Sequence, residues 1–100
     1  MKAQIMDHVK QFVSELPNED QGKIRGAIEA MEFGDFESLY IKTLKSPIKE
    51  LIIKRYRLVF FPHKACLYFV GAFIKKTAKT PKHEIDKAEK MRIIILRSIN

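Results

Sequence analysis

The stretch that decides the fold is YRLVFFPHKACLYFVGAFIKK, residues 56–76. Aromatic and β-branched residues dominate both halves, and Pro62-His63-Lys64 between them predicts a tight turn. We therefore predict two antiparallel neighbouring strands over residues 56–61 and 65–74. Apolar residues occupy both faces of the second strand, which favours a central position in a sheet.

The segments just upstream extend this sheet. Residues 48–53 are rich in isoleucine and leucine, so we predict a third strand that continues the antiparallel meander. Residues 35–47, which end at Ser46-Pro47, are expected to be an irregular connection.

Two helices are predicted before residue 35. Pro17 ends the first helix, because proline disfavours helical geometry in the residue before it. Asn18 resembles an N-cap, with Gln21 three residues later as in a capping box, and Gly34 closes the second helix. A turn this short predicts a helical hairpin. The expected buried stripes are Ile5, Val9, Phe12, Val13 and Leu16 on the first helix and Ile24, Ala27, Ile28 and Met31 on the second.

The chain after the strand pair predicts a basic loop and a final helix. Residues 75–79 are polar and basic, Thr80 is a plausible N-cap, and Pro81 suits the first helical position. The helix is predicted over residues 81–98. Residues 1–100 therefore form one α+β domain with helices at both ends and an antiparallel sheet between them.

Composition excludes several classes of protein. Hydrophobic residues make up 46% and charged residues 31% of the 100 residues, which is typical of a globular chain. The single cysteine, Cys66, excludes an internal disulfide framework. No apolar run approaches the roughly 18 residues of a membrane-spanning helix, and no signal-peptide pattern precedes the first helix. We expect a cytoplasmic protein without membrane association.

Sequence patterns of metal and cofactor sites are also missing. The three histidines, His8, His63 and His83, lack metal-ligand spacing, and the four glycines form no phosphate-binding loop. Cys66 lies within an apolar strand, where a buried filler is the simpler interpretation than a nucleophile. We therefore expect neither a metal nor a cofactor.

The formal net charge of +7 is unevenly distributed. Residues 1–39 carry four bases and eight acids, residues 40–82 carry eleven bases and one acid, and residues 83–100 carry four bases and three acids. A basic segment of this kind is typical of a surface that binds a polyanion. The alternative is a lysine-rich surface that serves solubility alone.

The predicted strand pairing gathers cations at one end of the sheet. Arg55 and Arg57 share a face of their strand while Tyr56 points the other way. Antiparallel pairing places them beside Lys75 and Lys76, which follow the next strand. Lys45, Lys54 and Lys79 are expected to border this cluster.

Such a cluster suits an RNA phosphodiester. Arginine binds phosphate oxygens in bidentate geometry, and preplaced cations stabilise the charge of the transition state. RNA supplies its own nucleophile, the 2′-hydroxyl. Tyr56 or Tyr68 is a candidate for stacking on a base, with packing inside the sheet as the alternative. For Arg55 and Arg57, the alternative is pairing with the acidic N-terminal helices.

The residues also resemble a known family. Residues 73–88, FIKKTAKTPKHEIDKA, resemble the C-terminal signature of the phage-derived HigB-like branch of the RelE/ParE toxin superfamily. Glu50-Leu51, Tyr56-Arg57 and the SELP ending of the first helix at residues 14–17 are similar too. The resemblance covers roughly residues 10–90.

The resemblance implies a RelE-like fold, in which a helical hairpin packs on a small twisted antiparallel sheet. It implies the toxin of a type II toxin–antitoxin module, a metal-independent endoribonuclease that cleaves mRNA on the ribosome and is inhibited by a helix-turn-helix antitoxin. Arg57, Lys75 and Lys76 are then the expected catalytic residues. The expected RNA-binding residues are Lys45, Lys54, Arg55, Tyr56, Lys79 and Lys82. The alternatives are a gyrase-inhibiting toxin of the ParE type and a degenerate relative that only binds an antitoxin.

Two positions depart from the pattern of the family. Ile52 follows Glu50-Leu51 where the family usually has an arginine, so a cation is lost unless Lys54 or Arg55 replaces it. The family usually begins with a strand, and only residues 1–5 precede the first helix here. We therefore expect that strand to be short or absent.

Overall fold

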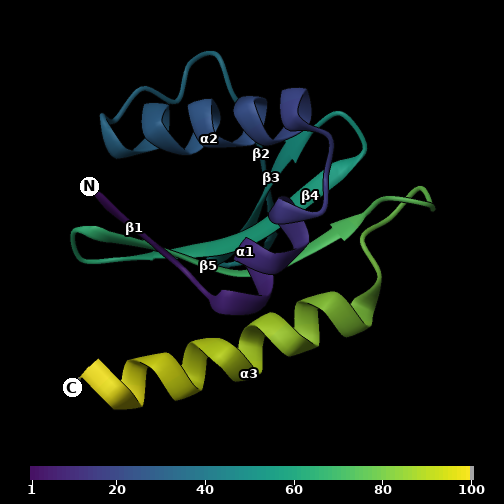
Figure 1. Cartoon of the computed structure of the whole chain (residues 1–100). Helices are drawn as coiled ribbons and strands as arrows, with labels where there is room; N and C mark the ends of the chain where they lie inside the picture. The colour runs from purple at the N-terminus through teal and green to yellow at the C-terminus, as the bar shows by residue number, and fades with distance from the viewer. Residues whose placement is uncertain (100) are drawn as a thin grey trace.

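A five-stranded sheet lies between two layers of helix in the computed structural model, which describes residues 1–99 (Figure 1). The predicted α+β architecture of a helical hairpin, a sheet and a C-terminal helix is confirmed. The elements in chain order are β1 (Lys2–Ile5), α1 (Asp7–Ser14), α2 (Asn18–Glu32), β2 (Tyr40–Lys45), β3 (Ile48–Ile53), β4 (Tyr56–His63), β5 (Cys66–Ile74) and α3 (Lys82–Ile99).

The strand order is β1-β5-β4-β3-β2. Strands β2 to β5 form the antiparallel meander, and β5 is central as predicted. The sheet is nevertheless mixed, because β1 pairs parallel with β5 from Lys2 opposite Cys66 to Ile5 opposite Phe69. Ile5, predicted to be helical, therefore belongs to a strand, although its side chain packs against the same core as expected.

The two hairpins that join β3 to β4 and β4 to β5 have two-residue loops. Lys54 and Lys64 begin these loops with φ values of 53° and 55°, the left-handed geometry that matches a tight turn to the twist of its strands. The second turn was predicted too early, since Pro62 and His63 belong to β4. Pro62 lies beyond the last β4 residue that pairs with β3, so its missing N–H leaves no gap in the sheet.

Strand β2 was not predicted, because residues 35–47 were expected to be irregular. It pairs antiparallel with β3 at the edge of the sheet, with a register shift between Thr43 and Lys45. Only Ile41 and Leu44 are half-buried among otherwise exposed residues. So few apolar residues give too weak an alternation to identify an edge strand from the sequence.

The helix ends also differ from the predicted caps. Asn18 is the first residue of α2 and makes no side-chain cap. Gln21 donates instead to the carbonyl oxygens of Ser14 (3.2 Å) and Leu16 (2.8 Å), and so ties the two helices at their turn. Helix α3 begins at Lys82, one residue later than predicted.

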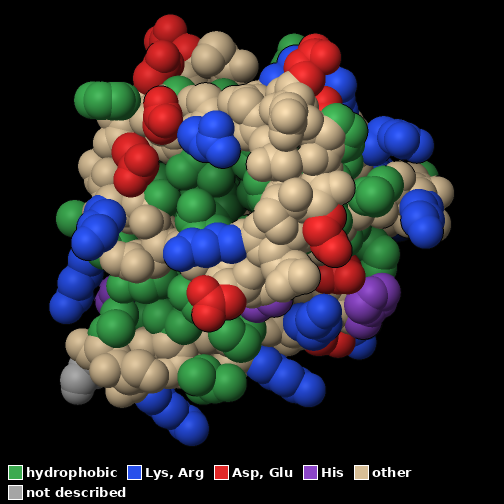
Figure 2. All heavy atoms as spheres, viewed as in Figure 1, with side chains coloured by type: hydrophobic (Ala, Val, Ile, Leu, Met, Phe, Trp, Pro, Cys, Tyr) green, Lys and Arg blue, Asp and Glu red, His purple; other side chains and the backbone are tan. Residues whose placement is uncertain are grey.

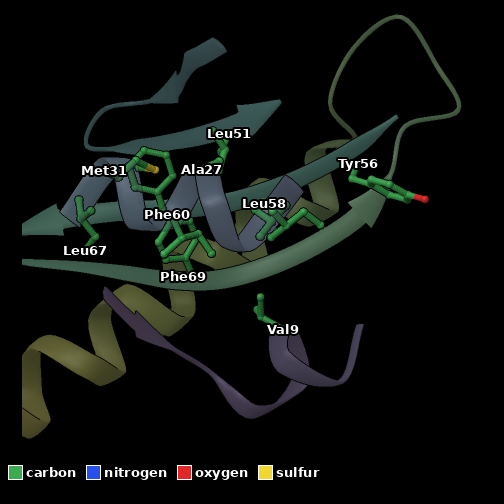
Figure 3. Close-up of a cluster of buried hydrophobic side chains, with 11 residues drawn as sticks. Val9, Ala27, Met31, Leu51, Tyr56, Leu58, Phe60, Leu67 and Phe69 are labelled. Atoms are coloured by element: carbon green, nitrogen blue, oxygen red, sulfur yellow. The ribbon is translucent and has the colours of Figure 1, made fainter. Parts of the chain in front are cut away.

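Both faces of the central strands are buried. The side chains that meet α1 and α2 include Leu58, Phe60 and Phe69, and Figure 3 shows them converging with Met31 of α2. The opposite face packs on α3 through the residues Ile48, Val59, Phe61, Tyr68, Val70, Ala88 and Ile95. This alternation along each strand fixes which side chains share a face with the candidate site.

Candidate nucleic-acid interface

The β3–β4 turn and the chain after β5 lie side by side, as the predicted strand pairing requires. The backbone N–H of Lys75 donates to the carbonyl oxygen of Arg55 over 2.7 Å, and Tyr56 pairs with Ile74 just below. This hydrogen bond joins two segments that are 20 residues apart in the sequence. Arg55, Arg57 and Lys75 are therefore gathered at one end of the sheet, and Lys76 follows directly.

Arg57 occupies the centre of this end. Only 7% of its surface is exposed, and its Nη1 donates to the carbonyl oxygens of Lys54 and Tyr56, each over 3.0 Å. Its Nε has no hydrogen-bond partner, and no acid of residues 1–99 forms an ion pair with it. Arg57 is thus a rigidly held cation whose charge is not neutralised by a carboxylate.

Glu50, the only acid in residues 40–82, is buried. Its side chain is 1% exposed and accepts a hydrogen bond from the hydroxyl of Thr80 over 2.8 Å. This bond holds the end of the β5–α3 loop against β3 and explains why Thr80 does not cap α3. Sequence reasoning assigned no role to Glu50, although a lone acid within an apolar strand of a basic segment was a usable signal.

The β5–α3 loop carries the exposed cations. Lys76 and Lys79 lie in the loop and Lys82 begins α3, and all three are exposed, whereas Lys75 is half-buried. None of these four lysines forms an ion pair within the described part of the chain. The hydrogen bond from the Lys75 N–H to the Arg55 carbonyl oxygen fixes the start of the loop. The hydrogen bond from the Thr80 hydroxyl to the Glu50 carboxylate fixes its end.

Lys54 and Tyr56 are bound to an acid of α2. The Nζ of Lys54 lies 2.6 Å from one carboxylate oxygen of Asp20, and the hydroxyl of Tyr56 donates to the other over 2.5 Å. Asp20 itself is only 6% exposed. The alternative for Arg55 and Arg57 was pairing with the acidic N-terminal helices, but neither forms an ion pair with residues 1–99. Lys54 forms such a pair instead, with Asp20 of α2.

These hydrogen bonds shift three pKa values. The bonds from Lys54 and Tyr56 lower the pKa of Asp20 below its usual 3.8. Hydrogen bonding to the Asp20 carboxylate in turn raises the pKa of Lys54 above 10.5 and that of Tyr56 above 10.0. Both predicted RNA-binding residues thus keep their protons and brace α2 against the sheet. Figure 3 shows the Tyr56 hydroxyl pointing away from the other labelled core residues.

The structure also places Lys45 and Ile52 relative to Arg57. Lys45 is exposed and pairs with Ile48 at the opposite end of β3, so it does not border Arg57. Ile52 pairs directly with Arg57 and shares its face. The position next to Arg57 therefore carries no cation, and the nearby Lys54 is paired with Asp20.

A second hollow lies away from these cations. It measures about 410 Å³ between β1, α1 and α2, and its apolar floor includes Val9, Ile24 and Leu58. Lys10, Arg25, Glu29 and Glu32 also line it. Figure 2 shows this green floor with blue and red side chains around it.

No group of three His, Cys, Asp or Glu side chains within residues 1–99 is placed to hold a metal ion. His8 hydrogen-bonds to the carbonyl oxygen of Val70 at 2.7 Å, and His83 lies 3.2 Å from Glu84. No helix of the described chain is long and apolar enough to cross a membrane.

Together these features define a small α+β protein with a cluster of fixed and exposed cations at one end of its sheet, a surface suited to phosphate groups. The model of the phage-derived protein Gp49-like family matches residues 11–92, so the chain belongs to that family, a RelE/ParE-like toxin family of toxin–antitoxin systems. No curated protein matches the chain at a significant level.

Proposed function

We propose that this protein is the toxin of a type II toxin–antitoxin module, of the HigB-like branch, and that it cleaves messenger RNA on the ribosome. The observation that carries the proposal is the charge arrangement at Arg57, Lys75 and Lys76. Strand pairing brings Arg57 and the chain at Lys75 and Lys76 to one end of the sheet, and none of the three forms an ion pair in the described chain, while the one acid of that segment is bonded to Thr80. Such a site can hold a phosphodiester without first displacing a carboxylate.

The proposed reaction needs no nucleophile from the protein. The 2′-oxygen of the RNA attacks the adjacent phosphorus, and the bond from phosphorus to the 5′-oxygen breaks. Negative charge grows on the non-bridging oxygens, where the guanidinium of Arg57 and the ammonium groups of Lys75 and Lys76 stabilise it. The 2′-hydroxyl gives up one proton and the departing 5′-oxygen takes one, so the step consumes no cofactor.

Purified ribosomes programmed with one mRNA test the cleavage directly. Wild-type protein is expected to create new 5′ ends in the mRNA, and Lys76→Ala to lower the rate by about 100-fold, the usual effect of losing one transition-state donor. Lys10→Ala, an exposed lysine on α1, is the matched control and should cleave normally. If wild type and Lys76→Ala give the same mRNA ends, the proposal is wrong.

The proposal includes two partners, the ribosome with its mRNA and a cognate antitoxin of the helix-turn-helix type. Expression of the toxin with the product of the neighbouring open reading frame is expected to relieve growth arrest and to yield one complex on gel filtration. DNA damage in place of shortened mRNA would instead identify a gyrase-inhibiting toxin.

A further inference from the structure

Tyr40 is a large aromatic side chain on an open edge of the sheet. It is the first residue of β2 and is 75% exposed, whereas Tyr56 and Tyr68 are at most 9% exposed. Strand β2 pairs only with β3, so its outer side has no neighbouring strand within residues 1–99. A single exposed aromatic residue needs no explanation by itself, and the case for Tyr40 rests on its neighbours.

Tyr40 lies in one cross-strand row with Arg57. It pairs with Ile52, and Ile52 pairs with Arg57, so the three residues share the α3-side face of the sheet. Adjacent strands are about 4.8 Å apart, which puts the Tyr40 backbone about 10 Å from that of Arg57. This separation is comparable to the reach of one nucleotide from its base to a neighbouring phosphate.

The charges along this face favour RNA. Lys42 is exposed and lies two residues from Tyr40 on the same face. The acid that pairs across from Lys42 is Glu50, which is 1% exposed and hydrogen-bonded to Thr80. An RNA strand that approaches Arg57 across β2 and β3 therefore passes the ring of Tyr40, the apolar side chain of Ile52 and the ammonium group of Lys42.

We propose that Tyr40 is the stacking platform for an unpaired RNA base next to the phosphate held at Arg57. This inference rests on the proposed function and adds a subsite to it. The ligand is single-stranded RNA, because only an unpaired base exposes its ring faces to a protein side chain. Stacking on Tyr40 tolerates any base, since every base has a π-face.

Ile52 gains a role in this arrangement. Its side chain is half-buried between Tyr40 and Arg57, where it provides apolar contact for the edge of the stacked base. Single-stranded RNA is then held by its base at Tyr40 and Ile52 and by its phosphate at Arg57 and Lys75.

Tryptophan fluorescence tests this subsite, because the chain contains no natural tryptophan. Tyr40→Trp places a reporter in the subsite, and Phe33→Trp is the matched control at an aromatic residue that is 89% exposed at the end of α2. The probe is a short single-stranded RNA with 2′-O-methyl groups, which binds without being cleaved, and its binding is followed by the anisotropy of a terminal dye. The RNA should quench the fluorescence of Tyr40→Trp and leave that of Phe33→Trp unchanged.

Affinity provides the second measurement. Tyr40→Ala is expected to weaken binding of this RNA by about 5- to 100-fold, the range of one lost stacking contact. Tyr40→Phe should stay within about 2-fold of wild type, because stacking needs the ring and not the hydroxyl.

The outcomes separate this inference from the proposed function. RNA that binds without quenching Tyr40→Trp, or with equal affinity for Tyr40→Ala and wild type, overturns the stacking platform and leaves cleavage untouched. Quenching without cleavage of mRNA on ribosomes supports the platform and rejects the nuclease. Free RNA that does not bind at all overturns the stacking platform, whereas the proposed function is overturned only if mRNA on ribosomes is not cleaved.

Discussion

The β3–β4 turn and the β5–α3 loop are neighbours that use their positive charge differently. In the turn, Lys54 is paired at 2.6 Å with the buried carboxylate of Asp20. In the loop, Lys76 and Lys79 are exposed and form no ion pair with residues 1–99. The turn and the loop are joined by the hydrogen bond from the Lys75 N–H to the Arg55 carbonyl oxygen.

The difference shows that basic residues of one sequence segment need not share one role. Lys54 contributes to folding, because it is the cation that neutralises the buried carboxylate of Asp20. We expect the loop lysines to contribute little to folding and to leave their charge available to a ligand, because they form no ion pair within residues 1–99. Each of the following predictions tests this division of roles.

The largest effect is expected from removing the loop cations. The double variant Lys75→Ala/Lys76→Ala should cleave mRNA on ribosomes at least about 100-fold more slowly than wild type. Its thermal unfolding should be almost unchanged, because neither ammonium group has an acid partner within residues 1–99. A loss of stability as large as that of Lys54→Ala would erase the distinction between the two regions.

The next effect concerns the bond that anchors the loop. Glu50→Ala removes the buried acceptor of the Thr80 hydroxyl and should lower the free energy of unfolding by about 1–3 kcal/mol in urea titrations. Thr80→Val should act through the same bond, so the double variant should lose less than the sum of the two single losses.

Thr77→Val is the control for this loop anchor, since its hydroxyl only reaches the carbonyl oxygen of Lys79 at the surface. Additive losses for Glu50 and Thr80, or an equal loss for Thr77→Val, would argue against the anchor.

A smaller effect, confined to acid, is expected at Asp20. Its pKa is lowered in the folded protein, so its contribution to stability is present above about pH 3.8 and is lost as the pH falls through the lower folded value. The difference in thermal stability between wild type and Asp20→Asn should therefore be constant near neutral pH and shrink below about pH 4. Lys54 and Tyr56 have raised pKa values, so their contributions are lost only in strong alkali.

Glu19→Gln is the matched control for Asp20, because Glu19 is an exposed acid in the same first turn of α2, 3.8 Å from Lys23. It should show no comparable dependence on acid pH. A stability difference for Asp20→Asn that grows as the pH falls would contradict the assignment.

Much of the fold follows from local patterns in the sequence. The apolar runs of β4 and β5 leave few arrangements other than central antiparallel strands, and Pro17 marks the break between the first two helices. Strand β1 is only four residues long and β2 has two half-buried positions, so neither carries enough periodicity to be identified alone. Both exist because a neighbouring strand offers backbone partners, which is a tertiary effect.

The candidate site was predictable to the level of strand pairing. Antiparallel geometry alone placed Arg55 and Arg57 beside Lys75, and the backbone of the structure agrees. The partners of the side chains were not predictable, because Asp20 lies 34 residues from Lys54 and Glu50 lies 30 residues from Thr80. Which cation is held by an acid therefore depends on packing between elements that the sequence does not place.

The salt dependence of RNA binding tests the central claim most directly. Each phosphate contact to single-stranded RNA contributes about 0.7 to the slope of log affinity against log salt concentration. Lys76→Ala is predicted to reduce the slope by about that amount, whereas Lys54→Ala, whose charge is held by Asp20, is predicted to leave it unchanged. Equal slopes for wild type and Lys76→Ala, or a reduction only in Lys54→Ala, would contradict the account.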